Sequence, residues 1–403
     1  MRLRPVLAAV AAAALASLAW AGAVAPAAGA APAPQAGGKH ASRVCSQAVA
    51  GSAACMAVRV DPATAPAGGV TPAAATPSGL FPADIQSAYK LPGATAGAGT
   101  TIAVVDAYDD PTAESDLGVY RSQFGLPACT TANGCFRKVG QTGTSTLPRK
   151  NASWAEEISL DLDMVSATCP NCHILLVEAS SASLANLGAA VNTAARLGAT
   201  AISNSYGGSD ASDATYGSFY NHPGIAVTAS TGDSGFGVQY PASSQYVVAV
   251  GGTSLTRAAG TTRGWTESAW SGAGSGCSAF NPAIPSASAF TTGCARRAVA
   301  DVSAVADPNT GVAVYDSTPY QGFSGWLVFG GTSASAPIIA SVYGLAGNAA
   351  TIDANDYPYQ HATSLFDVTT GSNGTCSPAQ LCTARAGWDG PTGLGTPNGT
   401  GAF

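Results

Sequence analysis

Short apolar segments alternate along this chain with segments whose apolar residues recur every three or four positions. The apolar, β-branched segments are residues 101–106, 173–178, 201–205, 225–229 and 246–250. The segments with the longer spacing include residues 114–124, 154–166 and 184–197. The first pattern is typical of strands buried in a parallel sheet, and the second is typical of helices that pack by one face. Their alternation predicts βαβ units, and therefore an α/β fold with a mostly parallel central sheet flanked by helices.

The N-terminal part of the chain lacks this alternation. Arg2 and Arg4 precede an apolar, Ala-rich run that ends near small residues, which predicts a cleaved signal peptide over residues 1–31. A membrane anchor is disfavoured because alanine contributes little transfer free energy and no basic cluster follows the run. Residues 32–78 are rich in Ala, Pro and Gly, which predicts a low-complexity pro-segment or linker without packed structure. One folded domain is expected over residues 79–403.

Charge is scarce in this sequence. Only 10% of the 403 residues are charged, the net charge is −6, and the sequence has no basic cluster. Such a chain is not expected to be a disordered tail, and it lacks the positive surface that nucleic-acid binding requires. Composition therefore predicts a large packed protein without a nucleic-acid partner, and a monomer is the default expectation.

Ten cysteines fall into five pairs that are close in the sequence, as expected in an oxidising compartment. The pairs are Cys45/Cys55, Cys129/Cys135, Cys169/Cys172, Cys277/Cys294 and Cys376/Cys382. Connectivity does not follow from the sequence, and Cys169 and Cys172 are also compatible with a redox pair or half of a zinc site. The absence of a second CxxC motif favours a structural disulfide. Together with the predicted signal peptide, the pairs indicate a secreted, extracellular protein.

A serine stands where a helix is expected to begin. Residues 330–337 read Gly-Gly-Thr-Ser-Ala-Ser-Ala-Pro and are followed by the apolar residues 338–345. This places Ser333 at a helix N-terminus, where free N–H groups and the helix dipole stabilise negative charge. Ser333 is therefore a candidate nucleophile, and a simple helix-capping serine is the alternative.

Two acidic residues share one face of the helix expected over residues 154–166. Glu157 and Asp161 are four positions apart, so their carboxylates repel each other. In a dry cleft one of them would keep its proton near neutral pH and would be able to take and return a proton. Because Glu156 and Asp163 are nearby, a solvated acidic face is the alternative.

A third acidic residue follows the apolar segment 225–229. Asp233 lies in the Gly-rich sequence Ser-Thr-Gly-Asp-Ser-Gly. A carboxyl group in such a loop stabilises a developing oxyanion only when it is protonated, since an ionised group would repel it. A turn-forming aspartate is the alternative.

Taken in this order, the three elements resemble the sedolisins, also called serine-carboxyl peptidases, over about residues 80–394. The resemblance implies a subtilisin-like three-layer fold and an acid-acting endopeptidase with protein or peptide substrates. It implies Ser333 as the nucleophile and Glu157 as the general base. Asp161 would then orient Glu157, and Asp233 would be the acid of the oxyanion hole. None of the four histidines lies in a base-like context, which disfavours a Ser-His-Asp triad.

The resemblance extends to residues around the predicted catalytic group. Asp106, at the end of an apolar segment, matches a family acid that extends the proton network. Residues 203–207 resemble the substrate-edge strand, which implies that Ser205 and Gly207 bind the peptide main chain. Tyr206 stands where the family often has tryptophan, so a role in the core alone is left open.

Residues near the C-terminus look like the calcium loop of sedolisins. Calcium prefers six or more oxygen ligands, and Asp367 and Asp389 supply two carboxylates. By position, the carbonyl groups of Val368, Arg385 and Gly387 would complete the protein's share of a Ca²⁺ site. The family commonly has glycine where Arg385 stands. Two acids in a C-terminal turn are the alternative to a metal site.

Two departures from the family are visible. Residues 32–78 are much shorter than the folded pro-domain that sedolisins usually carry, and residues 271–294 form a Gly/Ser/Cys-rich insertion. A catalytically silent, secreted binding protein is the main alternative function. An esterase is disfavoured because no Ser-centred GxSxG turn has the required strand and helix around it.

Overall fold

The computed structural model describes residues 40–61, 76–93 and 96–403, so the predicted signal peptide lies outside the described residues. A central sheet has the strand order β12-β11-β9-β7-β4-β6-β5, with β15 also paired to β11. Its strands are β4 (Thr101–Ala107), β5 (Phe136–Gly140), β6 (His173–Ala179), β7 (Ala201–Asn204), β9 (Ala226–Ser230), β11 (Val248–Arg257), β12 (Trp265–Ala269) and β15 (Val302–Val305). Every pairing is parallel except that of β11 with β12. The predicted α/β fold is confirmed.

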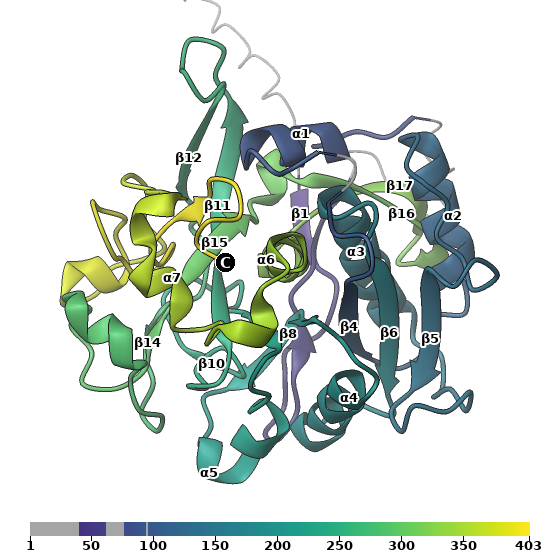
Figure 1. The fold of residues 1–403 in the computed structure, drawn as a ribbon, viewed down its shortest axis with the longest axis horizontal. Coiled ribbons are helices and arrows are strands. Elements are labelled where there is room, and N and C mark those ends of the chain that lie inside the picture. The colour runs from purple at the N-terminus through teal and green to yellow at the C-terminus, as the bar shows by residue number, and fades with distance from the viewer. Residues whose placement is uncertain (1–39, 62–75, 94–95) are drawn as a thin grey trace, which may run out of the picture. The chain divides into compact units, whose positions relative to one another are not determined.

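Helices pack against this sheet, and the two longest lie side by side (Figure 1). The helices are α1 (Pro82–Ala88), α2 (Ala113–Gln123), α3 (Ala152–Thr168), α4 (Leu184–Arg196), α5 (Asp213–Tyr216), α6 (Thr332–Ala346) and α7 (Tyr357–Gln360). The side chain of Asn151 caps α3 by accepting hydrogen bonds from the N–H groups of Ser153 and Trp154. Both α3 and α6 contact the sheet, so together they place residues from distant parts of the sequence at its centre.

Residues 40–61 correct one expectation. We expected residues 32–78 to lack packed structure, yet the described part forms β1 (His40–Arg43), β2 (Ala54–Cys55) and β3 (Val58–Asp61). Val44, Cys55 and Met56 are buried. The segment is too short to show a clear hydrophobic period, and its pairing partners lie far away in the sequence, so composition alone did not reveal it.

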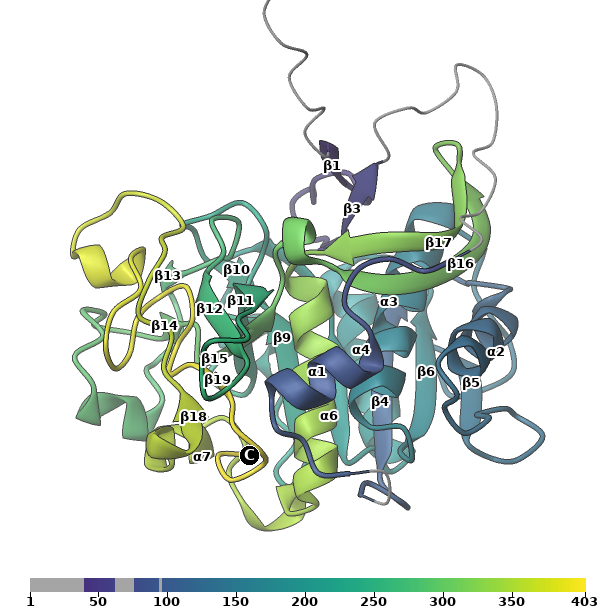
Figure 2. The same ribbon diagram turned by 90° about the horizontal axis from the view of Figure 1, so that it is seen from above.

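These N-terminal strands join two smaller sheets. One has the order β1-β3-β17-β16, and the other has the order β10-β8-β2. Their remaining strands are β8 (Tyr206–Ser209), β10 (Gln239–Tyr240), β16 (Val312–Tyr320) and β17 (Phe323–Gly330). Figure 2 shows β1 and β3 beside β17, next to the N-terminal end of α6. The short pairs β13 (Gly276–Cys277) with β14 (Ala298–Val299) and β18 (Leu365–Phe366) with β19 (Thr396–Pro397) complete the strands.

All ten cysteines form the five disulfides that their spacing predicts. Cys169 and Cys172 are bonded to each other between α3 and β6, which favours the structural reading over a zinc site. The described residues contain no group of three or more His, Cys, Asp or Glu side chains placed to hold a metal ion. Nor do they contain a helix long and apolar enough to cross a membrane.

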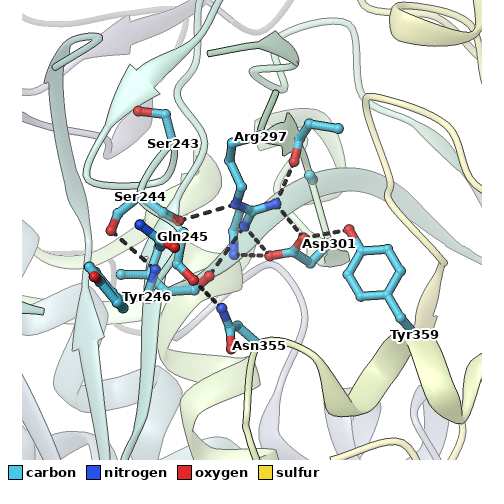
Figure 3. A network of polar contacts seen from close by, with 12 residues as sticks. Ser243, Ser244, Gln245, Tyr246, Arg297, Asp301, Asn355 and Tyr359 are labelled. Atoms are coloured by element: carbon cyan, nitrogen blue, oxygen red, sulfur yellow. Dashed lines mark hydrogen bonds and ion pairs between the residues drawn. The ribbon is translucent and has the colours of Figure 1, made fainter. Parts of the chain in front are cut away.

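A buried ion pair holds the C-terminal part against the sheet (Figure 3). Arg297 and Asp301 are 1% and 0% exposed, and the guanidinium donates to both carboxylate oxygens at 2.7 and 2.5 Å. Asp301 also accepts from the Tyr359 hydroxyl at 2.6 Å and from the Ala249 N–H at 2.7 Å. Because both charges are paired and hydrogen-bonded, the arrangement links α7, β11 and the approach to β15 at a defined position.

Candidate active site

Ser333 lies in the first turn of α6 and is fully buried. The residue before the helix, Gly331, has a φ of 94°, a conformation that favours glycine. A β-carbon on Gly331 would also lie 1.9 Å from the Met56 carbonyl oxygen, so a larger residue does not fit. The Ser333 hydroxyl donates to the Ser205 carbonyl at 3.3 Å. The backbone thus presents Ser333 at a helix N-terminus, which suits a nucleophile that carries developing charge.

Glu157 and Asp161 lie on α3, which packs against α6. Both are fully buried, as is nearly the whole of α3, so the solvated acidic face considered from the sequence is excluded. The Ser205 hydroxyl donates to Asp161 Oδ1 at 2.8 Å. Among the described residues, neither oxygen of Glu157 has a hydrogen bond of normal geometry. The Ser333 hydroxyl and the Ala57 N–H are nevertheless near enough to act to lower the pKa of Glu157, so this carboxyl is placed to exchange a proton with Ser333.

Asp106 completes a group of three buried carboxyls. It lies one residue before the end of β4, and burial raises its pKa to about 8. Burial also raises the pKa of Glu157, with the charges of Asp106 and Asp233 adding to the effect. Burial has the largest effect on Asp161 and raises its pKa, and the charges of Asp106 and Glu157 raise it further. The hydrogen bond from the Ser205 hydroxyl acts to lower it. Such carboxyls titrate as a group and retain protons near neutral pH, as proton exchange requires.

Asp233 has two differently placed carboxyl oxygens. Its Oδ1 accepts from both the N–H and the hydroxyl of Thr332, each at 2.8 Å. Its Oδ2 has no hydrogen-bond partner among the described residues. Burial raises the pKa of Asp233 to about 6, although the Thr332 hydrogen bonds and the charge of Arg43 act to lower it. Oδ2 is therefore the oxygen free to carry a proton toward a reacting group.

Gly207, predicted to bind substrate, lies in β8, the middle strand of the β10-β8-β2 sheet, and Ser205, predicted to do the same, directly precedes that strand. The Ser205 carbonyl accepts from the Met56 N–H at 3.2 Å, and Gly207 pairs with Ala54. A β-carbon at Gly207 would lie 2.3 Å from Gln239 Oε1 and 3.1 Å from the Met56 Cε, so the glycine makes room for both side chains. In the described structure β8 therefore pairs with β2, an N-terminal strand of the same chain.

Tyr206, whose role was left open, is fully buried. Its hydroxyl donates to Asn204 Oδ1 at 2.7 Å. Burial raises its pKa well above the ordinary tyrosine value, so it stays neutral. Tyr206 therefore supports the edge strand from the core.

The structure brings Ser333, Glu157, Asp161 and Asp233 together and adds neighbours that sequence reasoning missed. Arg43 donates to the Asp233 carbonyl at 2.5 Å and to the Ser234 hydroxyl at 2.9 Å. Met56 accepts from the Ser333 N–H at 3.4 Å. No local motif marks either residue. The one available signal was the Cys45/Cys55 pair, which indicated local order in a segment otherwise interpreted as a linker.

Comparison with known proteins gives two kinds of likeness, although no family model matches the chain. Kumamolisin from Bacillus sp. (strain MN-32) is 29% identical over 367 residues, which is 81% of this chain and 63% of that protein. Tripeptidyl-peptidase sed1 of Aspergillus fumigatus is 38% identical over 109 residues, 25% of this chain and 15% of that protein. The solved structure of Pseudomonas sedolisin, a serine-carboxyl proteinase, has a TM-score of 0.65 at 24% identity and covers 80% of this chain and 96% of its own.

This chain resembles the sedolisins in sequence and in fold. The sequence likeness to kumamolisin and the fold likeness to sedolisin both cover most of the chain, as the resemblance noted from the sequence implied. A psychrophilic protease designated S41 shares the fold with a TM-score of 0.52 at 19% identity, covering 81% of this chain and 99% of its own. The chain spans 63% of the length of kumamolisin.

The predicted calcium ligands lie in the loops near the C-terminus. Asp367 Oδ2 accepts from the Gly387 N–H at 2.9 Å, and Asp389 Oδ2 accepts from the Arg385 N–H at 3.1 Å. Burial, with the charge of Asp367 adding to it, raises the pKa of Asp389 to about 7. In the described part of the chain, neither carboxylate has an ion-pair partner. Two carboxylates without an ion-pair partner are chemically suited to a hard cation.

Proposed function

We propose that this protein is a secreted serine-carboxyl endopeptidase that hydrolyses peptide bonds in proteins or peptides at acid pH. One observation carries the proposal. Ser333 lies in the first turn of a buried helix, and both its hydroxyl and the charge of Asp233 act on the Glu157 carboxyl. The proposed nucleophile, base and oxyanion acid are therefore close together, and none of them is a histidine.

The reaction runs through an acyl-enzyme. Ser333 Oγ attacks the substrate carbonyl while Glu157 takes the hydroxyl proton. The Ser333 N–H and protonated Asp233 stabilise the oxyanion, and Glu157 then protonates the leaving amine. Water enters, gives its proton to Glu157 and hydrolyses the ester. Asp161 orients Glu157 and is itself positioned by the Ser205 hydroxyl.

Coupling between the two catalytic carboxyls sets the pH range. Glu157 must be ionised and Asp233 neutral, and their mutual repulsion favours states in which the pair carries one negative charge. At low pH both are neutral, and at high pH both are ionised. The active state has its charge on Glu157. Because the pKa of Asp233 is about 6, activity is expected to decline as pH rises through that value.

Two further properties belong to the proposal. The five disulfides support action in an oxidising, extracellular environment. We also assign Ca²⁺ to the loop of Asp367, Val368, Arg385, Gly387 and Asp389. The cation would neutralise the Asp367 and Asp389 carboxylates and so stabilise the C-terminal loops, with no part in the chemical steps. We expect the enzyme to act as a monomer.

Hydrolysis of denatured casein from pH 2 to 9 tests the function. Wild type, Ser333→Ala and Glu157→Gln are compared under the same conditions. Activity confined to acid pH and lost in both variants is the expected result. Activity that survives in Glu157→Gln means that another group is the base. An inert wild type, with Ser333 unreactive toward serine-directed reagents, favours a silent binding protein.

A further inference from the structure

Residues 232–237, here called the Asp233 loop, are held by backbone hydrogen bonds on both sides of Asp233. The first residue of this loop accepts from the Gly274 N–H at 2.8 Å. Gly235, two residues after Asp233, donates to the Gly272 carbonyl at 2.8 Å. Because these bonds flank the aspartate, the position of its backbone depends on a second loop that lies about forty residues further along the chain.

A third contact comes from a C-terminal loop of residues 371–384, which contains the Cys376–Cys382 disulfide. Within it, Asn373 accepts from the Phe236 N–H at 3.0 Å. Its own N–H donates to the Cys382 carbonyl at 2.9 Å. The backbone of Asn373 thus joins the Asp233 loop to the segment that carries the disulfide.

The side chain of Asn373 reaches the loop that contains Gly272 and Gly274. Its Nδ2 donates to the Ala273 carbonyl at 2.5 Å and to Ser275 Oγ at 2.7 Å, and the residue is only 4% exposed. An amide nitrogen has two hydrogens, and both are used here. Figure 2 shows the C-terminal loops, in yellow, beside β13, which follows Ser275. Asn373 therefore has hydrogen bonds in all three loops.

These bonds bear on the carboxyl group of Asp233, which is 9% exposed. Its Oδ1 is already held by two hydrogen bonds from Thr332, so the place of the unpaired Oδ2 follows from where the backbone lies. The charged or titratable groups around it are Arg43, which donates to its backbone carbonyl, and Glu157, on whose pKa its charge acts. Neither of them fixes the direction of Oδ2.

We propose that Asn373 is a positioning residue for the oxyanion acid: it holds the Asp233 loop in place, so that Asp233 Oδ2 can donate to the reacting carbonyl of the substrate. The inference rests on the proposed peptidase function. In this role Asn373 touches neither the substrate nor the reacting atoms and acts through Asp233 alone. A donor to a developing oxyanion works only at hydrogen-bond distance, so a small displacement of the loop weakens transition-state stabilisation.

Steady-state kinetics of the full chain with a fluorogenic peptide at acid pH give the first test. Asn373→Ala removes both side-chain hydrogen bonds and should lower kcat by about 10–10²-fold. KM should stay near the wild-type value, because the oxyanion exists in the transition state and not in the bound substrate.

Asn281→Ala is the matched control. Asn281 is 1% exposed, and its Nδ2 donates to the Ala211 and Ser243 carbonyls, each at 2.9 Å. The control therefore removes the same number of buried hydrogen bonds outside the Asp233 loop. It should lower the Tm about as much as Asn373→Ala does, while its folded fraction keeps wild-type kcat.

A double-mutant cycle tests whether Asn373 acts through Asp233. In an Asp233→Leu background the acid is gone, so adding Asn373→Ala should change kcat by less than about twofold. The same fold loss of kcat in both backgrounds overturns the inference, since Asn373 then acts on activity by another route.

The titration of Asp233 gives a readout that needs no turnover. In Ser333→Ala protein labelled with ¹³C-aspartate, the Asp233 carboxyl signal is assigned by its loss in Asp233→Asn. Asn373→Ala should lower the pKa of Asp233 from its value of about 6, because burial raises that pKa and a looser loop admits water. Asn281→Ala should leave the pKa unchanged.

Ser275→Ala decides the question if Asn373→Ala does not fold. It removes one of the two acceptors of the Asn373 amide and leaves the bond to the Ala273 carbonyl. The losses in kcat and in the pKa of Asp233 should then be smaller and in the same direction. No change in either quantity overturns the inference.

The outcomes separate this inference from the proposed function. If wild type hydrolyses peptide, and Asn373→Ala keeps both its kcat and its Asp233 pKa, the inference is overturned and the peptidase function stands. If wild type hydrolyses no peptide from pH 2 to 9 and Asn373→Ala still lowers the pKa of Asp233, the peptidase function fails while Asn373 keeps its place as the residue that positions Asp233. An inert wild type with an unchanged pKa overturns both.

Discussion

Arg59 and Glu156 form a buried ion pair that joins the N-terminal strand β3 to the helix that carries Glu157. The Nη1 atom of Arg59 lies 2.6 Å from Glu156 Oε1, and the side chains are 1% and 0% exposed. Arg59 also contacts Asp61 at 2.8 Å and stacks on the Phe323 ring at 4.3 Å. The charge of Glu156 is therefore compensated within the protein, whereas that of the adjacent Glu157 has no cationic partner among the described residues.

Removing this cation should destabilise the fold most at neutral pH. Burial raises the pKa of Glu156 to about 7 even though Arg59 lowers it, so Arg59→Met should raise it further. When a carboxyl has a higher pKa in the folded than in the unfolded protein, the free energy of unfolding falls as the pH rises above the unfolded pKa. We expect a loss of about 3–5 kcal/mol in unfolding free energy at pH 7 and a smaller loss at pH 4.

Urea denaturation at both pH values, with Ser333→Ala as background to prevent self-cleavage, measures this difference. Arg196→Met, at an exposed arginine, is the control and should change the free energy by less than about 0.5 kcal/mol. An equal loss at pH 4 and pH 7 would show that Arg59 acts through packing rather than through its charge.

The adjacent glutamates Glu156 and Glu157 should have separate roles. Glu157→Gln removes the proposed base and should lower kcat by about 10²–10⁴-fold. Glu156→Gln leaves Arg59 without its buried partner, so it should lower the unfolding free energy while the folded fraction keeps wild-type kcat. Steady-state kinetics and denaturation of both variants test this. A comparable loss of kcat in Glu156→Gln contradicts the assignment of the base.

The protonation of Asp233 should limit activity at high pH. Its Oδ1 is already occupied by Thr332, so asparagine can keep that acceptor and place its NH₂ group where Oδ2 stands. Wild-type kcat should fall as pH rises through about 6, whereas Asp233→Asn should retain measurable activity to higher pH. Asp233→Leu should lose about 10²–10³-fold at every pH. An alkaline limb unchanged in Asp233→Asn would assign the titration to another group.

Calcium should stabilise the C-terminal loops. If the ion binds, a concentration about 100 times its Kd adds about 2.7 kcal/mol to the unfolding free energy. The effect should weaken toward pH 4, because protons compete for Asp389, whose pKa is about 7. Thermal unfolding with EDTA, then with added Ca²⁺, measures it, and Asp367→Asn should remove the response. An identical Tm in EDTA and Ca²⁺ at pH 7 argues against the site.

Much of the fold was predictable because the local spacing of apolar residues indicates its strands and helices. The strand segments and helices 114–124, 154–166 and 184–197 appear close to their expected bounds. The spacing of apolar residues that marks each strand or helix can be recognised from a few neighbouring positions. The close cysteine pairs were predictable for the same reason, since loops that short favour their own closure. The four proposed catalytic residues were found because each lies in a short motif.

By itself, the sequence determined the α/β class, the presence of five close cysteine pairs and the residue types available for catalysis. Tertiary structure decided which side chains lose water: α3 is buried nearly all round because α2, α6 and β16 cover it. It also decided that Thr332 occupies Asp233 Oδ1 and that Met56 lies against Ser333. These relationships depend on contacts between residues far apart in the chain, and no local hydrophobic period encodes such contacts.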